Sequence, residues 1–353
     1  MEQQENEDRA KKLKYAGNPY QLGGTRHYRL AGGVRDGVRC IDVHTGSGFD
    51  YTIVPDRGMD ISLASYKGRN LTYLTDAAEA HPAYYNPEGT EWLRTFSGGL
   101  LTTCGPTYLG PPCEDEGERL GLHGRISAIP ARDVCDLSDP ETGIIRITGS
   151  LHDIRPFGTK VAVKREIVSE IGTPAVVVTD TVTNKGKDPV PLCLLYHINF
   201  GYPFLTEQAD FCVPSAQCAG YDDYTRKRMK ERFHMHSPSA SLSERNYMHT
   251  FRGGPVTMGI WNKRIDMGLA VTVTFDSGAL PYVTQWMLEN PIDYVAALEP
   301  ANVPCLSRSE LRSLRLLPQL EPGESRTFSV TIGILEGNTR IAEQLTVPAE
   351  NGD

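Results

Sequence analysis

The sequence predicts an all-β fold in which large antiparallel sheets stack on one another and helices are few and short. Its 34 glycines and 24 prolines are spread evenly and divide the 353 residues into many short segments. Between these breaks, apolar and polar residues alternate with the period of two that marks a strand with one face in water. The hydrophobic fraction of 39% is ample for a core, so we expect two large sheets that cover each other's apolar faces.

Four segments show this alternation most clearly. In one of them Val271, Val273 and Phe275 share one face and threonines share the other. Residues 184–189 (Asn-Lys-Gly-Lys-Asp-Pro) predict a turn. Residues 192–196 form a continuous apolar run, which favours a strand buried on both faces. The four alternating segments are residues 161–168, 176–183, 270–275 and 326–334.

Helical patterns are confined to the two ends of the chain. Residues 6–15 are polar and predict a short helix or a frayed arm, and residues 339–345 predict a short helix. Residues 222–249 are polar and carry many charges, so we expect them to run over the surface. No repeat, linker or shift in composition separates domains. We therefore expect a polar N-terminal arm over residues 1–20 and a single sandwich domain over residues 21–353.

Charge and composition exclude several classes of function. The 36 Lys and Arg against 44 Asp and Glu give a net charge of −8 without a basic stripe, which disfavours nucleic acid and anionic membrane surfaces as partners. The acidic N-terminus does not resemble a signal peptide, and no apolar stretch has transmembrane length, so we expect a cytoplasmic protein. The 8 cysteines lack a Cys-x-x-Cys pair and are expected to be free, mostly buried thiols.

Two histidines and one late glutamate are the candidates for proton transfer, which needs an acid and a base that work near neutral pH. His123 lies in Gly-Leu-His-Gly-Arg, a context that an ordinary turn would also explain. His197 follows the buried run, where a satisfied core histidine is the alternative. Glu299 ends the apolar residues 294–298 and would be costly to bury unpaired. A strand end in water is the alternative for Glu299, and Pro300 supports it.

Arginines beside aromatic residues are candidates for binding a carbohydrate, whose C–H faces stack on rings while its hydroxyl groups bond to polar groups. Arg57 follows Asp56 and precedes a glycine, and Arg94 lies two residues after Trp92. Trp286 is a further stacking platform. A surface turn explains Arg57 equally well, and a core position is the commoner role of a tryptophan.

Other chemistries find little support. His234 and His236 have the spacing of two residues on one face of a strand, but no carboxylate follows before Glu244, so we expect no metal site. The sequence has no Gly-x-Ser-x-Gly, no phosphate-binding loop and no dinucleotide fingerprint. We therefore expect neither a nucleophilic mechanism nor an organic cofactor.

Five segments together resemble the aldose 1-epimerase (galactose mutarotase) superfamily, and within it a poorly characterised bacterial branch of aldose 1-epimerase-like proteins. They occur in order and extend the resemblance over roughly residues 25–335. The resemblance implies a large antiparallel β-supersandwich, in agreement with the strand pattern. The segments are residues 55–61, 97–105, 121–125, 196–203 and 298–300.

The resemblance also implies roles for individual residues. His197 would donate a proton to the ring oxygen of a sugar, Glu299 would take the proton of the anomeric hydroxyl, and His123 would hold the ring or share the acid role. The expected reaction is the interconversion of the anomers of an aldose or modified sugar, without a metal or organic cofactor. Contacts to the sugar are expected from Arg57, Arg94, Asn199 and Trp286.

This mechanism requires a charged His197 beside an ionised Glu299, a state that their mutual field favours, and it predicts a bell-shaped pH dependence. Two alternatives stay open: a sugar-binding or sensing module without turnover, and an epimerase or lyase that acts on another sugar. The arginines of residues 226–252 leave an acidic or phosphorylated sugar open. The expected partner is a small sugar, and a homodimer is compatible with the sequence.

Overall fold

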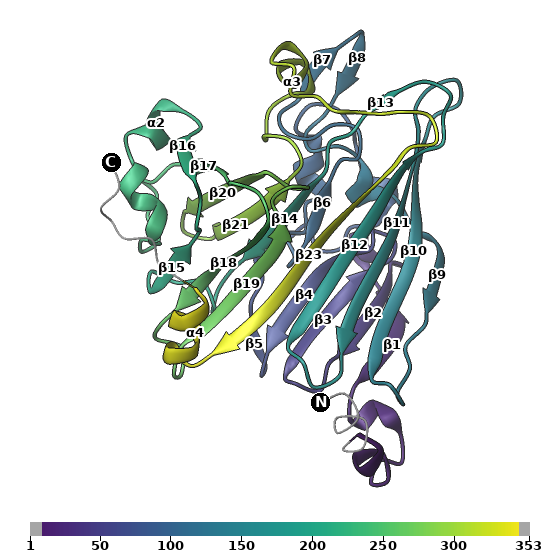
Figure 1. Cartoon of the computed structure of the whole chain (residues 1–353), viewed down its shortest axis with the longest axis vertical. Helices are drawn as coiled ribbons and strands as arrows, with labels where there is room; N and C mark the ends of the chain where they lie inside the picture. The colour runs from purple at the N-terminus through teal and green to yellow at the C-terminus, as the bar shows by residue number, and fades with distance from the viewer. Residues whose placement is uncertain (1–8, 346–353) are drawn as a thin grey trace.

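Three antiparallel sheets make up the computed structural model, which describes residues 9–345 (Figure 1). The all-β prediction is confirmed. The N-terminal sheet has five strands in the order β1-β2-β3-β4-β5. Its strands are β1 (Gly24–Arg29), β2 (Arg39–His44), β3 (Phe49–Val54), β4 (Asp60–Tyr66) and β5 (Arg69–Asn70).

The largest sheet has eight strands in the order β15-β18-β19-β23-β12-β11-β10-β9. The four alternating segments of the sequence are all strands of this sheet, within β11, β12, β19 and β23, as predicted. The strands are β9 (Arg132–Asp136), β10 (Ile144–Ile154), β11 (Lys160–Glu170), β12 (Ala175–Asn184), β15 (Ala209–Cys212), β18 (Pro255–Asn262), β19 (Leu269–Asp276) and β23 (Ser325–Glu336).

The third sheet has six strands in the order β16-β17-β20-β21-β14-β6. The strands are β6 (Thr102–Cys104), β14 (Leu195–Phe200), β16 (Gln217–Gly220), β17 (Arg245–Thr250), β20 (Tyr282–Glu289) and β21 (Tyr294–Ala301). Two small pairs complete the strands, β7 (Cys113–Asp115) with β8 (Glu118–Leu120) and β13 (Val190–Pro191) with β22 (Gln319–Leu320).

Short helices lie at the ends and edges of the sheets (Figure 1). Residues 9–13 are helical, within the predicted segment 6–15, whose first three residues lie outside the described part of the chain. The predicted C-terminal helix is α4 (Asn338–Gln344). The others are α2 (Asp223–Arg226), α3 (Arg308–Ser313), η1 (Pro19–Gln21), η2 (Gly33–Arg35), η3 (Pro82–Tyr84), η4 (Glu91–Thr95), η5 (Ile126–Ala128) and η6 (Met229–Phe233).

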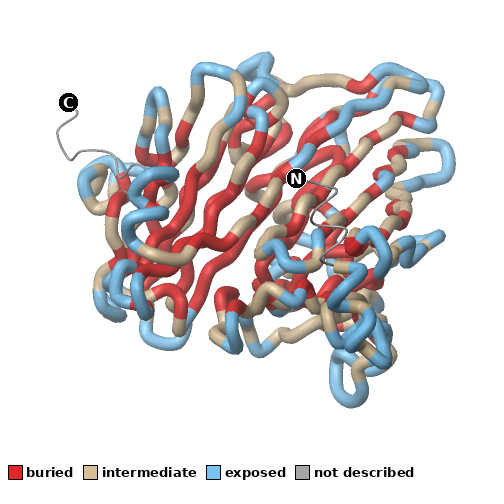
Figure 2. The backbone as a smooth tube through the Cα atoms, turned by 60° about the horizontal axis from the view of Figure 1, so that its bottom comes forward, coloured by how far each residue is buried: buried red, intermediate tan, exposed pale blue. Residues whose placement is uncertain are grey.

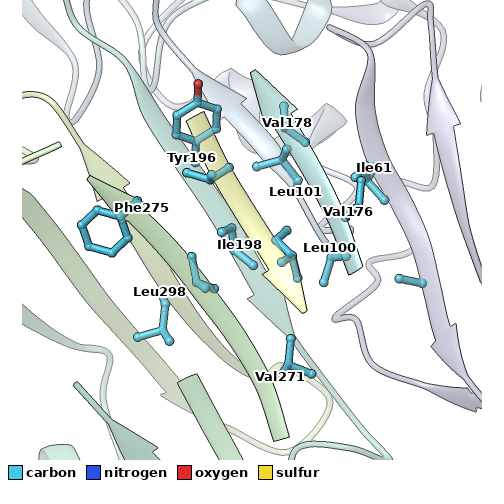
Figure 3. Packing of buried hydrophobic residues seen from close by; sticks show 14 of the residues in the cluster. Ile61, Leu100, Leu101, Val176, Val178, Tyr196, Ile198, Val271, Phe275 and Leu298 are labelled. Carbon is cyan, nitrogen blue, oxygen red and sulfur yellow. The ribbon is translucent and has the colours of Figure 1, made fainter. Parts of the chain in front are cut away.

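Figure 2 shows buried residues along the strands and exposed residues mostly in the connections between them. Side chains from all three sheets form one large core cluster. Figure 3 shows Tyr196, Ile198 and Leu298 of the six-stranded sheet among valines of the eight-stranded sheet. These three side chains are 0% exposed. Burying an Ile or Leu side chain contributes about 1.5–3 kcal/mol, so the inner face of the six-stranded sheet is fixed by packing.

An ion network joins the three sheets through Arg165 of β11, which is 0% exposed. Its guanidinium donates to both carboxylate oxygens of Asp180 on β12 at 2.8 and 2.6 Å and to Asp60 of β4 at 2.7 Å. It also donates to Thr103 of β6 at 2.8 Å, while the Tyr196 hydroxyl of β14 donates to Asp180 at 2.9 Å. The network therefore fixes β6 and β14 against the rest of the fold.

Two local predictions need correction. The apolar run 192–196 is buried throughout, but its strand, β14, begins only at Leu195 and continues to Phe200. Residues 222–249 do not simply run over the surface, because they contain α2, η6 and most of β17. Arg245 of β17 is 0% exposed and pairs with Glu231 at 2.5 Å and with Glu289. A buried ion cluster thus underlies a sequence that has the composition of a surface loop.

All eight cysteines are free, and Cys40, Cys104, Cys193 and Cys212 are buried. Within residues 9–345, no helix has both the length and the apolar character needed to cross a bilayer.

Candidate active site

The floor of the candidate site is one row of side chains across the six-stranded sheet. Met248 pairs with Thr284, Thr284 pairs with Glu299, and His197 pairs with Thr102. The pairs Leu195–Ala301 and Ile198–Leu298 set the register of β14 and β21. This register places His197 directly opposite Glu299.

Strand alternation decides which way these two side chains point. Their neighbours Ile198 and Leu298 lie in the core between the sheets (Figure 3). Since successive side chains of a strand point to opposite faces, His197 and Glu299 share the other face. His197 Nε2 lies 3.3 Å from Glu299 Oε1, and the side chains are 6% and 3% exposed.

A cavity of about 310 Å³ lies over this row and is walled by aromatic rings. His123 and His197 meet edge to face with ring centroids 5.8 Å apart. Trp92 lies 4.9 Å from His123, and Trp286 lies 5.5 Å from His197. The lining residues are Trp92, Leu93, Phe96, Gly110, Pro111, Leu122, His123, His197, Tyr221, Glu244, Asn246, Met248, Thr284, Trp286, Glu299 and Cys305.

His123 reaches the cavity from a turn whose backbone is packed tightly. Its φ is +58°, and its N–H donates to the Gly110 carbonyl at 3.0 Å. A Cβ at Gly121 would lie 2.1 Å from the Pro87 carbonyl oxygen, and one at Gly124 would lie 2.5 Å from that of Gly105. Gly121 and Gly124 are therefore required because their backbone lies against neighbouring backbone, with no room for a side chain. This close packing fixes the turn that carries His123.

Burial shifts both members of the central pair toward their neutral forms. It lowers the pKa of His197 to about 3, with a further contribution from His123, while the interaction of the ring with the Asn199 side chain opposes the change. Burial raises the pKa of Glu299 well above its usual range, and Glu244 adds to this. Burial also lowers the pKa of His123 to about 4.

This charge state differs from the one expected from the sequence. We expected an imidazolium beside a carboxylate, whereas the buried site favours a neutral imidazole beside a protonated carboxyl group. Burial in a low dielectric disfavours each separate charge, and the two groups lie 3.3 Å apart. The pair carries one proton in either state.

The structure brings four of the seven predicted site residues together at the cavity, namely His123, His197, Glu299 and Trp286. The other three contact different groups. The Arg57 guanidinium is buried and donates to the carbonyls of Ala80 at 2.8 Å and Thr95 at 2.7 Å.

Arg94 and Asn199 likewise do not line the cavity. The Arg94 side chain is 76% exposed and pairs with Glu91 at 2.7 Å. The Asn199 side chain donates to the carbonyls of Gly99 and His197, both at 3.0 Å. The side chains of these residues and of Arg57 make other contacts outside the cavity lining, and their role in binding a sugar stays a prediction.

Sequence reasoning missed the side of the cavity formed by β17 and the residue before it. Asn246 donates to Glu244 at 2.7 Å, and both line the cavity together with Met248. The signal was the alternation of Asn246 and Met248 with buried Arg245 and Tyr247, which the many charges nearby obscured. Cys305 also lines the cavity, but burial raises the pKa of its thiol far above neutrality, so it is not a thiolate.

Across residues 9–345, no three His, Cys, Asp or Glu side chains come together in the arrangement of a metal site. His234 and His236, the pair considered from the sequence, instead contact Asp210 at 2.6 Å and Glu289 at 3.2 Å.

Solved structures with a similar fold place the chain in the galactose mutarotase-like class of β-sandwiches. A crystal structure from Klebsiella pneumoniae, described as a "putative aldose 1-epimerase", superimposes with a TM-score of 0.85 and 23% identity, covering 94% of this chain and 93% of that one. A galactose 1-epimerase from Lactobacillus acidophilus gives a TM-score of 0.61 with 11% identity, covering 90% and 100%. A galactose mutarotase-like protein from Clostridium acetobutylicum gives 0.63 with 13% identity, covering 90% and 99%.

The model of a family described as "Domain of unknown function (DUF4432)" matches residues 35–334, which is most of the chain. The chain therefore belongs to this family. No curated protein sequence matches it.

Proposed function

We propose that this protein interconverts the α and β anomers of an aldose or modified sugar by acid–base ring opening. The observation that carries the proposal is the His197–Glu299 pair, 3.3 Å apart and buried at the floor of a cavity with aromatic walls. Fold similarity to aldose 1-epimerase-like structures supports the same reaction class.

The reaction needs one group that accepts a proton and one that donates a proton, and the pair supplies both with its single proton. Glu299, protonated at rest, gives its proton to the ring oxygen as the bond from that oxygen to C1 breaks. His197, neutral at rest, takes the proton of the C1 hydroxyl as the aldehyde forms. Rotation about C1–C2 and reversal of these transfers close the other anomer.

These roles reverse the assignment expected from the sequence, because burial decides which member of the pair holds the proton. Each transfer contributes roughly 10²–10⁴-fold to the rate. His123, 5.8 Å from the His197 ring, completes the wall against which the sugar lies.

The lining favours an uncharged sugar. Among its described residues there are four aromatic rings of Trp, Phe and Tyr, two carboxyl groups and no lysine or arginine. Aromatic faces suit the C–H face of a pyranose, and Asn246 and Thr284 offer hydrogen bonds to its hydroxyl groups. A phosphate or carboxylate would lie near Glu244 and Glu299 without a counter-charge, which is costly in a desolvated site.

Exchange between anomers can be followed directly by saturation-transfer NMR or polarimetry with a panel of neutral, acidic and phosphorylated sugars. We expect faster exchange with a neutral aldose and a loss of at least about 10²-fold in Glu299→Gln, which keeps the shape of the side chain and should keep binding. Full activity of this variant contradicts the assignment. Binding without faster exchange identifies a sugar-binding module instead, and an unsaturated product identifies a lyase.

A further inference from the structure

Asn199 lies two residues after His197 on β14, so the two side chains project from the same face of the strand. Both N–H groups of the Asn199 side-chain amide bond to the backbone. Nδ2 donates to the carbonyls of Gly99 and His197, each at 3.0 Å. Turning the amide over would direct its oxygen at two carbonyl oxygens. The acceptor end, Oδ1, is therefore fixed in the opposite direction.

Among the described residues, Oδ1 of Asn199 and Nδ1 of His197 are both buried without a hydrogen-bond partner, as is Nδ1 of the neighbouring His123. Asn199 Oδ1 is an acceptor, and His197 Nδ1 is a ring nitrogen that becomes a donor when it carries a proton. Buried polar atoms without partners are rare because they lose their bonds to water on folding. Nε2 of the same ring is already accounted for, since it lies 3.3 Å from Glu299 Oε1.

We propose that Asn199 is a positioning residue whose Oδ1 accepts a hydrogen bond from His197 Nδ1–H, which holds the imidazole in the Nδ1–H tautomer and leaves the lone pair of Nε2 directed at Glu299. The two unpartnered atoms then complete each other. In the other tautomer, the lone pair of Nδ1 would face the amide oxygen, which is repulsive. Of its ring neighbours, Phe96 and Trp286 offer no acceptor, and the His123 ring meets it edge to face with centroids 5.8 Å apart.

The tautomer fixes the direction of proton flow in the pair. A bare Nε2 can only accept, so the proton between the two groups resides on the Glu299 carboxyl, and Nε2 is ready to take the proton of an anomeric hydroxyl. The hydrogen bond from His197 to Asn199 Oδ1 also favours the protonated imidazole that forms during the reaction, in line with the effect of Asn199 on the pKa of His197. This consequence for catalysis rests on the proposed function; the tautomer itself does not.

Nitrogen-15 NMR of protein labelled in its histidines tests the tautomer without a substrate. The chemical shifts distinguish a protonated from a bare ring nitrogen, and His197→Gln identifies the signals. We expect wild-type His197 to show a protonated Nδ1 and a bare Nε2 at neutral pH. A protonated Nε2 overturns the proposal whether or not the protein exchanges anomers, and absence of exchange with the expected spectrum rejects only the proposed function.

Two variants separate positioning from packing. Asn199→Leu keeps the size of the side chain without an acceptor and should mix the two tautomers, whereas Asn246→Leu, a matched change at the same cavity that does not involve His197 Nδ1, should leave the His197 shifts in place. Asn199→Asp keeps an acceptor and adds charge, so it should retain the Nδ1–H tautomer and move the titration midpoint of His197 upward by about 1–3 pH units. An unchanged midpoint in Asn199→Asp overturns the proposal even if Asn199→Leu fails to fold.

Discussion

The Arg165 network and the histidines of the cavity are two groups of buried ionisable side chains that differ in how completely they are hydrogen-bonded. The Arg165 network has every guanidinium nitrogen bonded to a carboxylate, a hydroxyl or a carbonyl oxygen. The histidines of the cavity each have a buried Nδ1 without a partner of ordinary geometry, and the pKa of each is lowered to about 3 or 4.

This difference indicates that the Arg165 network stabilises the fold and that the histidines of the cavity are the candidates for proton transfer. A buried charge that bridges three sheets is tolerated because every proton has an acceptor. The groups that burial keeps neutral lie beside a cavity, and perturbed pKa values gather at functional sites, where acids and bases are tuned for their task. Four substitutions test this comparison.

The largest effect is expected at Arg165. Arg165→Met leaves Asp60 and Asp180 buried without their cation, so the free energy of unfolding should fall by about 3–5 kcal/mol. Urea denaturation followed by circular dichroism measures this. The control is Arg326→Met, whose side chain is 45% exposed and pairs only with Glu324, and which should change stability by less than about 0.5 kcal/mol. Equal losses of unfolding free energy in both variants would show that the Arg165 network does not stabilise the fold.

The acid sensitivity of the fold should depend on the histidines of the cavity. Because the pKa of His123 is about 4 in the folded protein and 6.5 as its ordinary value, the unfolded chain binds a proton between pH 6.5 and 4 that the folded protein does not. The titration of His123 therefore leaves the free energy of unfolding unchanged above pH 6.5. Between pH 6.5 and 4 it lowers the free energy of unfolding as the pH falls, by at most about 1.4 kcal/mol per pH unit.

His123→Asn, which tolerates the positive φ at this position, should flatten that slope while it changes stability near pH 7 by less than about 1 kcal/mol. Urea denaturation at pH 7, 6, 5 and 4 provides the measurement. An unaltered slope in the variant would mean that His123 is not the neutral buried group described above.

A moderate effect is expected for Trp286, which lines the cavity beside His197. Trp286→Ala removes an aromatic platform and should weaken the binding of a neutral sugar by roughly 0.5–1.5 kcal/mol, about 2- to 12-fold in Kd, with the fold unaltered. Calorimetric titration gives the affinity. The variant binding the sugar as tightly as wild type would place the sugar elsewhere in the cavity.

The smallest effect is expected for Arg94. Its side chain is 76% exposed, with Glu91 as its ion-pair partner, and exposed pairs contribute about 0–1 kcal/mol. Arg94→Ala should therefore leave sugar affinity and anomer exchange within about twofold of wild type. A loss of tenfold or more would restore the role in substrate binding that the sequence suggested.

The strands and the central pair followed from local sequence, for identifiable reasons. Alternation is a property of neighbouring residues, so the strands of the eight-stranded sheet could be predicted without knowledge of their partners. Glu299 was identified because a carboxyl group at the end of an apolar run is unusual. Features that depend on distant contacts could not be predicted: Arg57 bonds to carbonyls 23 and 38 residues away, and buried Arg245 made β17 resemble a surface segment.

The row formed by β17, β20, β21 and β14 is bordered by η4, by the loop at Tyr221 and by Glu244. The His197–Glu299 pair is set by strand register and by a core that tolerates little change. The border residues Tyr221 and Glu244 follow β16 and precede β17, and the Tyr221 N–H donates to the Asn246 carbonyl at 2.9 Å. To redirect the protein to another sugar, the border segments should therefore be exchanged together, while the His197–Glu299 pair and the strands that hold it are kept.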